Sequence, residues 1–81
     1  MSYMIELYYQ APADPRKESD IALRVEKLGG RLDFREEPDV QGPQSICLTF
    51  EFDSLSKAES AVDLLRRGGE HVEGPVEYAA D

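Results

Sequence analysis

The residues of this chain that could support chemistry fall on two segments in which apolar and polar side chains alternate. Glu6 and Tyr8 lie on the first segment, and Cys47, Thr49 and Glu51 lie on the second. Two neighbouring carboxylates can share a proton, which raises the pKa of one of them, and such a pair can act as general acid and base where a cleft excludes water. One hypothesis is therefore an enzymatic site built from Glu6, Tyr8 and Glu51.

The spacing of the other reactive side chains does not favour nucleophilic or metal chemistry. A cysteine nucleophile needs a histidine or a helix N-terminus beside it, and Cys47 falls in the middle of an expected strand. His71 is the single histidine and has no cysteine at ligand spacing. Glu36, Glu37 and Asp39 lack the alternating oxygen ligands of a calcium loop. We therefore predict no catalytic residue, no metal site and no cofactor.

Length and charge limit the classes of function. A chain of 81 residues suits one core, so residues 1–81 are predicted to form a single domain. The net charge is −8 and the nine basic residues are scattered. Because binding to polyanions requires a basic stripe, nucleic acid and anionic membrane surfaces are excluded as partners. Basic proteins remain electrostatically permitted.

Cysteine content and hydropathy indicate a compartment. Cys47 is the only cysteine, so it cannot form an internal disulfide, which favours a reducing environment. No apolar run approaches the roughly 18 residues that cross a bilayer, and the first residues lack the basic region of a signal peptide. We therefore expect a cytoplasmic protein.

The two halves of the chain repeat one order of elements: strand, helix, Gly-Gly, strand. Period-2 alternation predicts strands over 3–9, 31–36, 45–52 and 70–78, and spaced aliphatic residues with capping residues predict helices over 15–28 and 55–67. A turn-rich loop is predicted over 37–44 and a frayed tail over 79–81. One face of each strand is apolar, and the expected inward residues are Tyr3, Ile5, Leu7, Tyr9, Leu32, Phe34, Ile46, Leu48, Phe50, Phe52, Val72, Val76 and Tyr78.

This βαββαβ order resembles the ferredoxin-like sandwich, an α+β fold. The resemblance implies a two-layer structure with an antiparallel sheet in the order 4-1-3-2 and two helices on one face. Gly74-Pro75 places the last strand at an edge or at a bulge, since proline cannot donate to a ladder. The strand over 31–36 is the other edge, guarded by charged residues.

An RNA-binding version of this fold would present several aromatic residues on the outer face of its central strands. Here only Tyr8 is aromatic among the outward residues of those strands. The pattern therefore argues against RNA recognition.

The first forty residues also resemble ACT domains, the small regulatory modules that bind amino acids. The resemblance is carried by Pro15, Ile21, Val25, Leu28 and Gly29, which have a similar spacing. It implies a ligand site near Asp14 and Arg16, between the first loop and a neighbouring subunit. Arg16 stands where the family has glycine, and Ala13 where it has aspartate.

Three hypotheses of function follow. The first is a non-enzymatic interaction module that forms a homodimer or binds a protein partner through the uncovered sheet face or an edge strand. The second is an ACT-like domain that binds a small molecule, and the third is an enzyme. The partner-binding residues predicted for the first hypothesis are those on the outer face of the two central strands: Met4, Glu6, Tyr8, Cys47, Thr49 and Glu51.

Overall fold

The computed structural model describes residues 1–38 and 44–78 of the chain. The predicted loop over 37–44 lies mostly outside these residues, and the predicted tail over 79–81 lies wholly outside them. Six elements follow one another along the chain: β1 (Ser2–Gln10), α1 (Pro15–Lys27), β2 (Gly30–Glu36), β3 (Ser45–Phe52), α2 (Leu55–Arg67) and β4 (His71–Tyr78). Each differs from its predicted range by at most one residue at either end.

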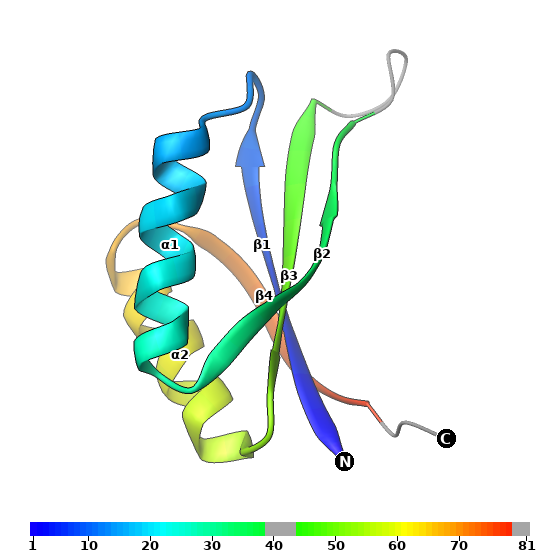
Figure 1. Ribbon diagram of the computed structural model, residues 1–81, viewed down its shortest axis with the longest axis vertical. Coiled ribbons are helices and arrows are strands. Elements are labelled where there is room, and N and C mark those ends of the chain that lie inside the picture. The colour runs from blue at the N-terminus through cyan, green and yellow to red at the C-terminus, as the bar shows by residue number, and fades with distance from the viewer. Residues whose placement is uncertain (39–43, 79–81) are drawn as a thin grey trace.

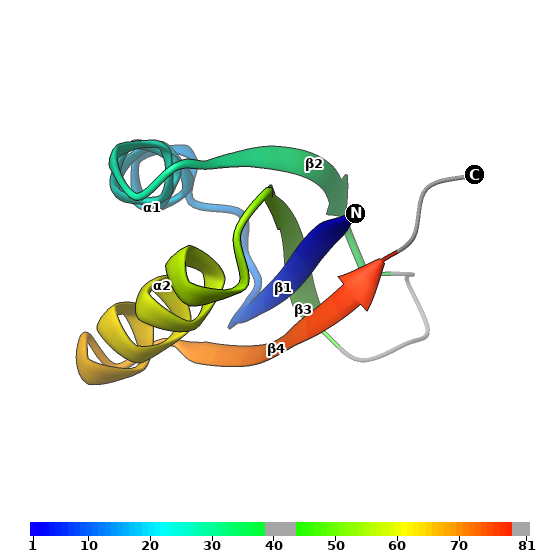
Figure 2. The same ribbon diagram turned by 90° about the horizontal axis from the view of Figure 1, so that it is seen from below.

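The strands form one antiparallel sheet in the order β2-β3-β1-β4. Both helices lie on the same side of this sheet (Figures 1 and 2). The predicted ferredoxin-like α+β sandwich, with strand order 4-1-3-2, is therefore confirmed. We call the sheet face without helices the open face.

The core fills the space between the sheet and the helices. Ile5 and Leu7 of β1 lie opposite Phe50 and Leu48 of β3, and all of these side chains are fully buried or nearly so. The helices contribute their apolar stripes, with Ile21, Val25, Ala58, Ala61, Val62 and Leu65 buried. The predicted inward face of the two central strands is thus confirmed.

Both helices begin directly after a capping residue. The Asp14 carboxylate accepts a hydrogen bond from the Lys17 amide at 3.1 Å, and the Ser54 hydroxyl accepts one from the Lys57 amide at 3.4 Å. These contacts satisfy backbone donors that the first helical turn leaves without partners.

A bulge in β2 reverses the faces of its C-terminal half. Leu32 pairs with Phe50, but Phe34 pairs with Thr49, so the register shifts at Asp33. Directly paired residues share a face. Phe34 therefore lies on the open face and Arg35 on the helix side, and the prediction that Phe34 points inward is wrong.

The physical reason for this bulge is a polar cluster at one end of the core, formed by Tyr9, Glu18 and Arg35. Glu18 of α1 is held there with its side chain only 15% exposed, and Arg35 donates to it at 2.6 and 3.0 Å. The Tyr9 hydroxyl also donates a hydrogen bond to Glu18. A largely buried carboxylate needs such partners, and phenylalanine at the position of Arg35 could not supply them.

A second bulge interrupts β4. Met4 pairs with Val76 and Glu6 pairs with Glu73, which leaves Gly74 and Pro75 opposite a single residue of β1. Gly74 has a φ of +110°, which favours glycine. The strand is also an edge, so both predicted places for Pro75 are confirmed. Val72 stays in the core, whereas Val76 and Tyr78 are exposed on the open face, contrary to prediction.

Candidate functional site

Four of the predicted partner-binding residues form one hydrogen-bonded group on the open face. The Tyr8 hydroxyl donates to Oε2 of Glu6 at 3.0 Å, and the Cys47 thiol donates to the same oxygen at 3.7 Å. The Cys47 sulfur also lies 3.9 Å from the hydroxyl of Thr49. The rings of Tyr8 and His71 form a T-shaped pair, with centroids 5.7 Å apart. Glu6 is thus held in place by side chains from two strands.

The surroundings of Tyr8 and Cys47 favour the protonated forms of both side chains. Burial, and then the hydrogen bond to Glu6, raise the pKa of the Tyr8 hydroxyl well above its usual range. Burial also raises the pKa of the Cys47 thiol, and the Glu6 carboxylate adds to this effect. Cys47 is therefore a thiol at neutral pH, and the thiolate that a nucleophile requires is disfavoured.

The two carboxylates on the central strands do not form a pair. Met4 lies opposite Glu51 and Glu6 lies opposite Thr49, so the two glutamates are diagonal neighbours on the open face. Glu51 forms an ion pair with Arg31. Since Glu6 bonds to Tyr8 and Cys47 and Glu51 bonds to Arg31, no hydrogen bond joins the carboxylates.

The open face carries a groove of about 590 Å³. Residues of the central strands form its floor, and residues of the edge strands β2 and β4 form its sides. The apolar residues at the sides are more than half exposed: Phe34 is 57% exposed, Val76 60% and Tyr78 56%. The full lining is Met4, Glu6, Asp33, Phe34, Thr49, Glu51, Val76 and Tyr78. We call it the open-face groove.

The groove brings together four of the six residues predicted for partner binding. Met4, Glu6, Thr49 and Glu51 line it, and Tyr8 and Cys47 lie beside it. Tyr8 also lines a separate depression of about 390 Å³ with His71 and Glu73.

Sequence reasoning missed the apolar sides of the groove. For Val76 and Tyr78 a signal existed, because the bulge that Gly74-Pro75 suggests would reverse every side chain after it. For Phe34 there was none, since residues 31–36 alternate without interruption.

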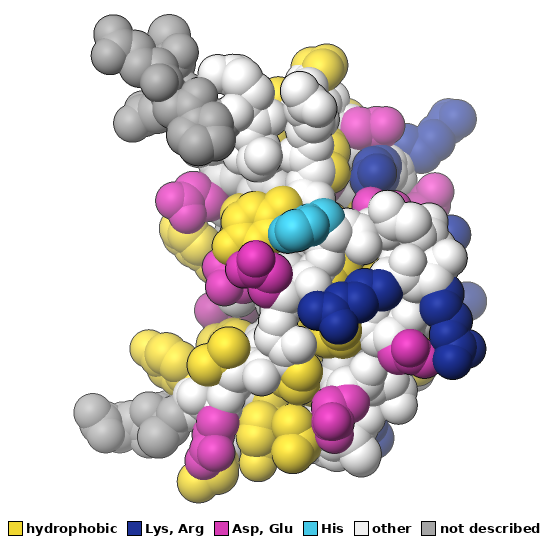
Figure 3. Space-filling model, turned by 180° about the vertical axis from the view of Figure 1, so that it is seen from behind, with side chains coloured by type: hydrophobic (Ala, Val, Ile, Leu, Met, Phe, Trp, Pro, Cys, Tyr) yellow, Lys and Arg dark blue, Asp and Glu magenta, His cyan; other side chains and the backbone are white. Residues whose placement is uncertain are grey.

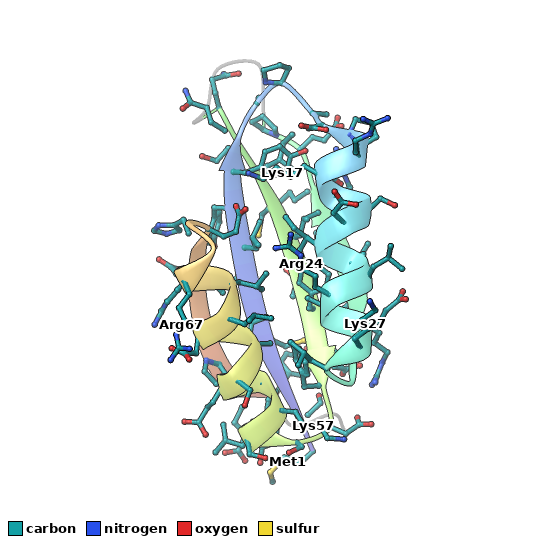
Figure 4. The ribbon with its side chains drawn as sticks, turned by 90° about the vertical axis from the view of Figure 1, so that its left-hand side faces the viewer. Met1, Lys17, Arg24, Lys27, Lys57 and Arg67 are labelled. Atoms are coloured by element: carbon teal, nitrogen blue, oxygen red, sulfur yellow. The ribbon has the colours of Figure 1, made fainter. Side chains whose placement is uncertain are left out.

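Charge is distributed unevenly between the two sides of the molecule. Of the nine Lys and Arg residues, all except Arg31 and Arg35 lie in the helices. Figure 4 shows this for Lys17, Arg24, Lys27, Lys57 and Arg67 on the helix side. The left-hand side of Figure 3 shows hydrophobic and acidic side chains next to one another and no Lys or Arg. The carboxylates placed on the open face by strand pairing or by the groove are Glu6, Asp33, Glu36, Glu51 and Glu73.

The two residues predicted for ligand binding lie together at the start of α1. Asp14 and Arg16 line a depression of about 260 Å³, with Lys17, Arg24 and Glu70 among its other residues. Lys17 is paired with Glu70 at 3.1 Å, and the Asp14 carboxylate caps the helix. The charges of this depression are thus mixed, and one of the two predicted residues has a structural role.

Two further expectations concern metals and membranes. Within residues 1–38 and 44–78, no group of three or more His, Cys, Asp or Glu side chains is positioned to hold a metal ion. Asp39, one of the loop carboxylates considered for calcium, lies outside the described residues. In the same part of the chain, no helix has the length and apolar character needed to cross a bilayer.

The geometry defines a ferredoxin-like sandwich whose uncovered sheet face carries an apolar-sided, acidic groove. No protein-family model, curated protein or solved structure matches this chain. A functional conclusion therefore rests on the open face itself.

Proposed function

We propose that this protein is a non-enzymatic interaction module that binds a protein partner through its open face. The observation that carries the proposal is the exposure of Phe34, Val76 and Tyr78, each more than half accessible, around one groove. Large apolar side chains that surround a groove in this way are typical of a surface that another molecule covers. Their burial would contribute favourable free energy to binding.

The face supports this role better than either edge of the sheet. Strand addition requires an edge with a regular row of free backbone groups. The β2 edge contains the bulge at Asp33, and the β4 edge contains the bulge at Gly74 and Pro75. Bulges twist an edge and interrupt its pairing, so both edges are protected against a further strand.

The pKa shifts also favour binding over catalysis. A general base or nucleophile near neutral pH needs a pKa close to 7, and the pKa values of Tyr8 and Cys47 are raised away from that value. The hydrogen bonds of Glu6 and Glu51 to other groups remove the support for a carboxylate pair. The remaining role of these polar groups is to shape and charge the groove.

The proposal includes a cytoplasmic location. It is supported by the free, half-buried Cys47, which a reducing compartment would keep as a thiol. Fractionation of cells with an antibody against the chain tests this, and recovery from a secreted fraction would contradict it.

Site-specific photo-crosslinking tests the interaction directly. A benzoylphenylalanine replaces Phe34 in one variant and Leu23 in another, and both are irradiated in the cells that make the protein. Leu23 is a matched control because it is an exposed apolar residue on the helix side, 55% accessible. We expect protein adducts from position 34 and none from position 23. Adducts at both positions, or none at position 34, would contradict the proposal.

The mass of the adduct separates the two kinds of partner. A product of twice the 9.1 kDa chain indicates a second copy, and any other mass indicates a different protein. Sedimentation velocity at micromolar concentration measures self-association independently. Tyr8→Glu adds a negative charge beside the groove and should weaken association with a second copy, which presents the same acidic face.

A further inference from the structure

We infer that the partner in the open-face groove is a positively charged protein segment with apolar side chains, and not a second copy of this chain. The inference rests on the proposed function and specifies its partner. It is drawn from the charges that surround the apolar sides of the groove and from the lack of neutralising groups among the described residues.

The carboxylates of the groove lack cationic partners of their own. Glu6 accepts hydrogen bonds from Tyr8 and Cys47 at Oε2, and its Oε1 accepts none from the described residues. Asp33 forms no ion pair within residues 1–38 and 44–78. A cation entering the groove would therefore meet two carboxylates with free charge.

Glu51 differs because Arg31 is already bound to it. Arg31 is the only Lys or Arg whose strand position faces the open side, and it also lies 3.4 Å from Asp53. Its charge is thus shared between two carboxylates and cannot neutralise the rest of the face. The face as a whole is acidic.

An acidic face disfavours a second copy. In a twofold dimer the same surface meets itself, so the carboxylates of one copy, Glu6 and Asp33 among them, would face the same acidic surface of the other copy. Like charges brought together at an interface reduce affinity, whereas a basic partner gains both complementarity and a faster encounter. Charge complementarity therefore selects a Lys- or Arg-containing partner.

The width of the groove selects a protein segment over a small cation. Phe34 lies on β2 and Tyr78 on β4, which are three strand spacings apart, or about 14 Å. One alkylammonium group cannot contact both sides. A segment that places apolar side chains against Phe34, Val76 and Tyr78, and ammonium or guanidinium groups over Glu6 and Asp33, uses every part of the groove.

The test is a titration of the isotope-labelled protein followed by amide NMR shifts. The probe is a short peptide in which Leu and Lys alternate. Comparison peptides of equal length replace Lys by Glu or Leu by Ser, and a further arm uses spermidine. We expect shifts with the Leu-Lys peptide at Met4, Phe34, Thr49 and Val76, and much weaker binding of either comparison peptide and of spermidine.

Matched variants locate the interaction. Glu6→Gln and Asp33→Asn should each weaken the Leu-Lys peptide about two- to fivefold, the range for a partly exposed charge pair. Glu26→Gln, which removes one charge from an exposed position on α1, should leave the affinity unchanged. Phe34→Ser should abolish binding, and Leu23→Ser should not.

The outcomes separate the two proposals. Equal weakening by Glu26→Gln, or shifts that spread over the helices, would show unspecific attraction and overturn the inference. Spermidine binding at the same residues with equal affinity would also overturn it. A third outcome is a protein that forms a dimer, loses the dimer on Phe34→Ser, and does not bind the Leu-Lys peptide. It would overturn the inference while the proposed function stands. No binding and no association or crosslink at the open face would refute both.

Discussion

Gly30 packs directly against core side chains and offers a sharp test of the packing. It is the first residue of β2, directly after the turn that follows α1. A Cβ at this position would lie 2.5 and 2.6 Å from ring carbons of Phe52 and 2.6 Å from a methyl carbon of Val25. Both neighbours are fully buried, so neither can move aside into solvent. The space for a side chain is therefore missing on two sides.

The substitution Gly30→Ala should destabilise the fold. Gly30 does not have a positive φ, so backbone strain contributes nothing and the cost is steric. Carbon atoms normally meet at about 3.5–4.0 Å, so the neighbours would have to shift by about 1 Å within a close-packed core. Overpacking of this kind costs about 1–3 kcal/mol, a large part of the stability of a small protein.

Urea denaturation followed by circular dichroism measures this loss as a lower midpoint at unchanged slope. Gly68→Ala is the matched control, because its φ is −78° and its added Cβ would meet no atom closer than 3.4 Å. It should be neutral or stabilising by a few tenths of a kcal/mol. A smaller side chain at position 52, in Phe52→Leu, should reduce the cost of Gly30→Ala. Equal midpoints for Gly30→Ala and wild type would refute the reasoning.

Two further predictions concern the faces of the sheet and the polar end of the core. Leu48→Ala, at a side chain 1% exposed, should lower the free energy of unfolding by about 2–5 kcal/mol in the same urea assay, and Thr49→Ala on the open face should cost far less; similar losses would contradict the two-faced sheet. The Arg35 guanidinium holds the pKa of the Glu18 carboxyl below its ordinary value of 4.5. The carboxylate therefore stabilises the fold fully at pH values above its unfolded-state pKa. This contribution is lost as the pH falls through its folded-state pKa. Thermal denaturation from neutral pH to about pH 3 should therefore show a shallower acid-induced loss for Glu18→Gln than for wild type, and identical slopes would exclude this role.

The two central strands show how far a sequence pattern can reach. Ile5, Leu7, Leu48 and Phe50 alternate with polar residues, and the structure places them against the helices as predicted. Such strands are hydrogen-bonded on both sides, and one-residue slips would expose every apolar side chain, so the pattern leaves one favourable register. The same register places Met4, Glu6, Thr49 and Glu51 on the open face.

The edge strands show where the pattern fails. Leu32 and Phe34 alternate as regularly as the central residues, yet they lie on opposite faces. An edge strand is paired on one side only, so it can accept an extra residue at a smaller cost in hydrogen bonds. The alternation of apolar and polar residues in the sequence does not reveal the extra residue of the bulge. The position of Phe34 on the open face therefore could not be predicted from the alternation.

The sequence by itself determined the order of elements, the capped helix starts and the apolar face of β1 and β3, because these depend on local backbone preferences and on a period of two. Only the tertiary structure decided what the open face offers to a partner. The bulge in β2 exists where Glu18 of α1 needs Arg35 beside it, and that need arises only when the helix packs on the sheet. The same register shift turns Phe34 to the open face. The contact between Glu18 and Arg35 on the helix side of the sheet therefore determines one apolar side of the groove on the open face.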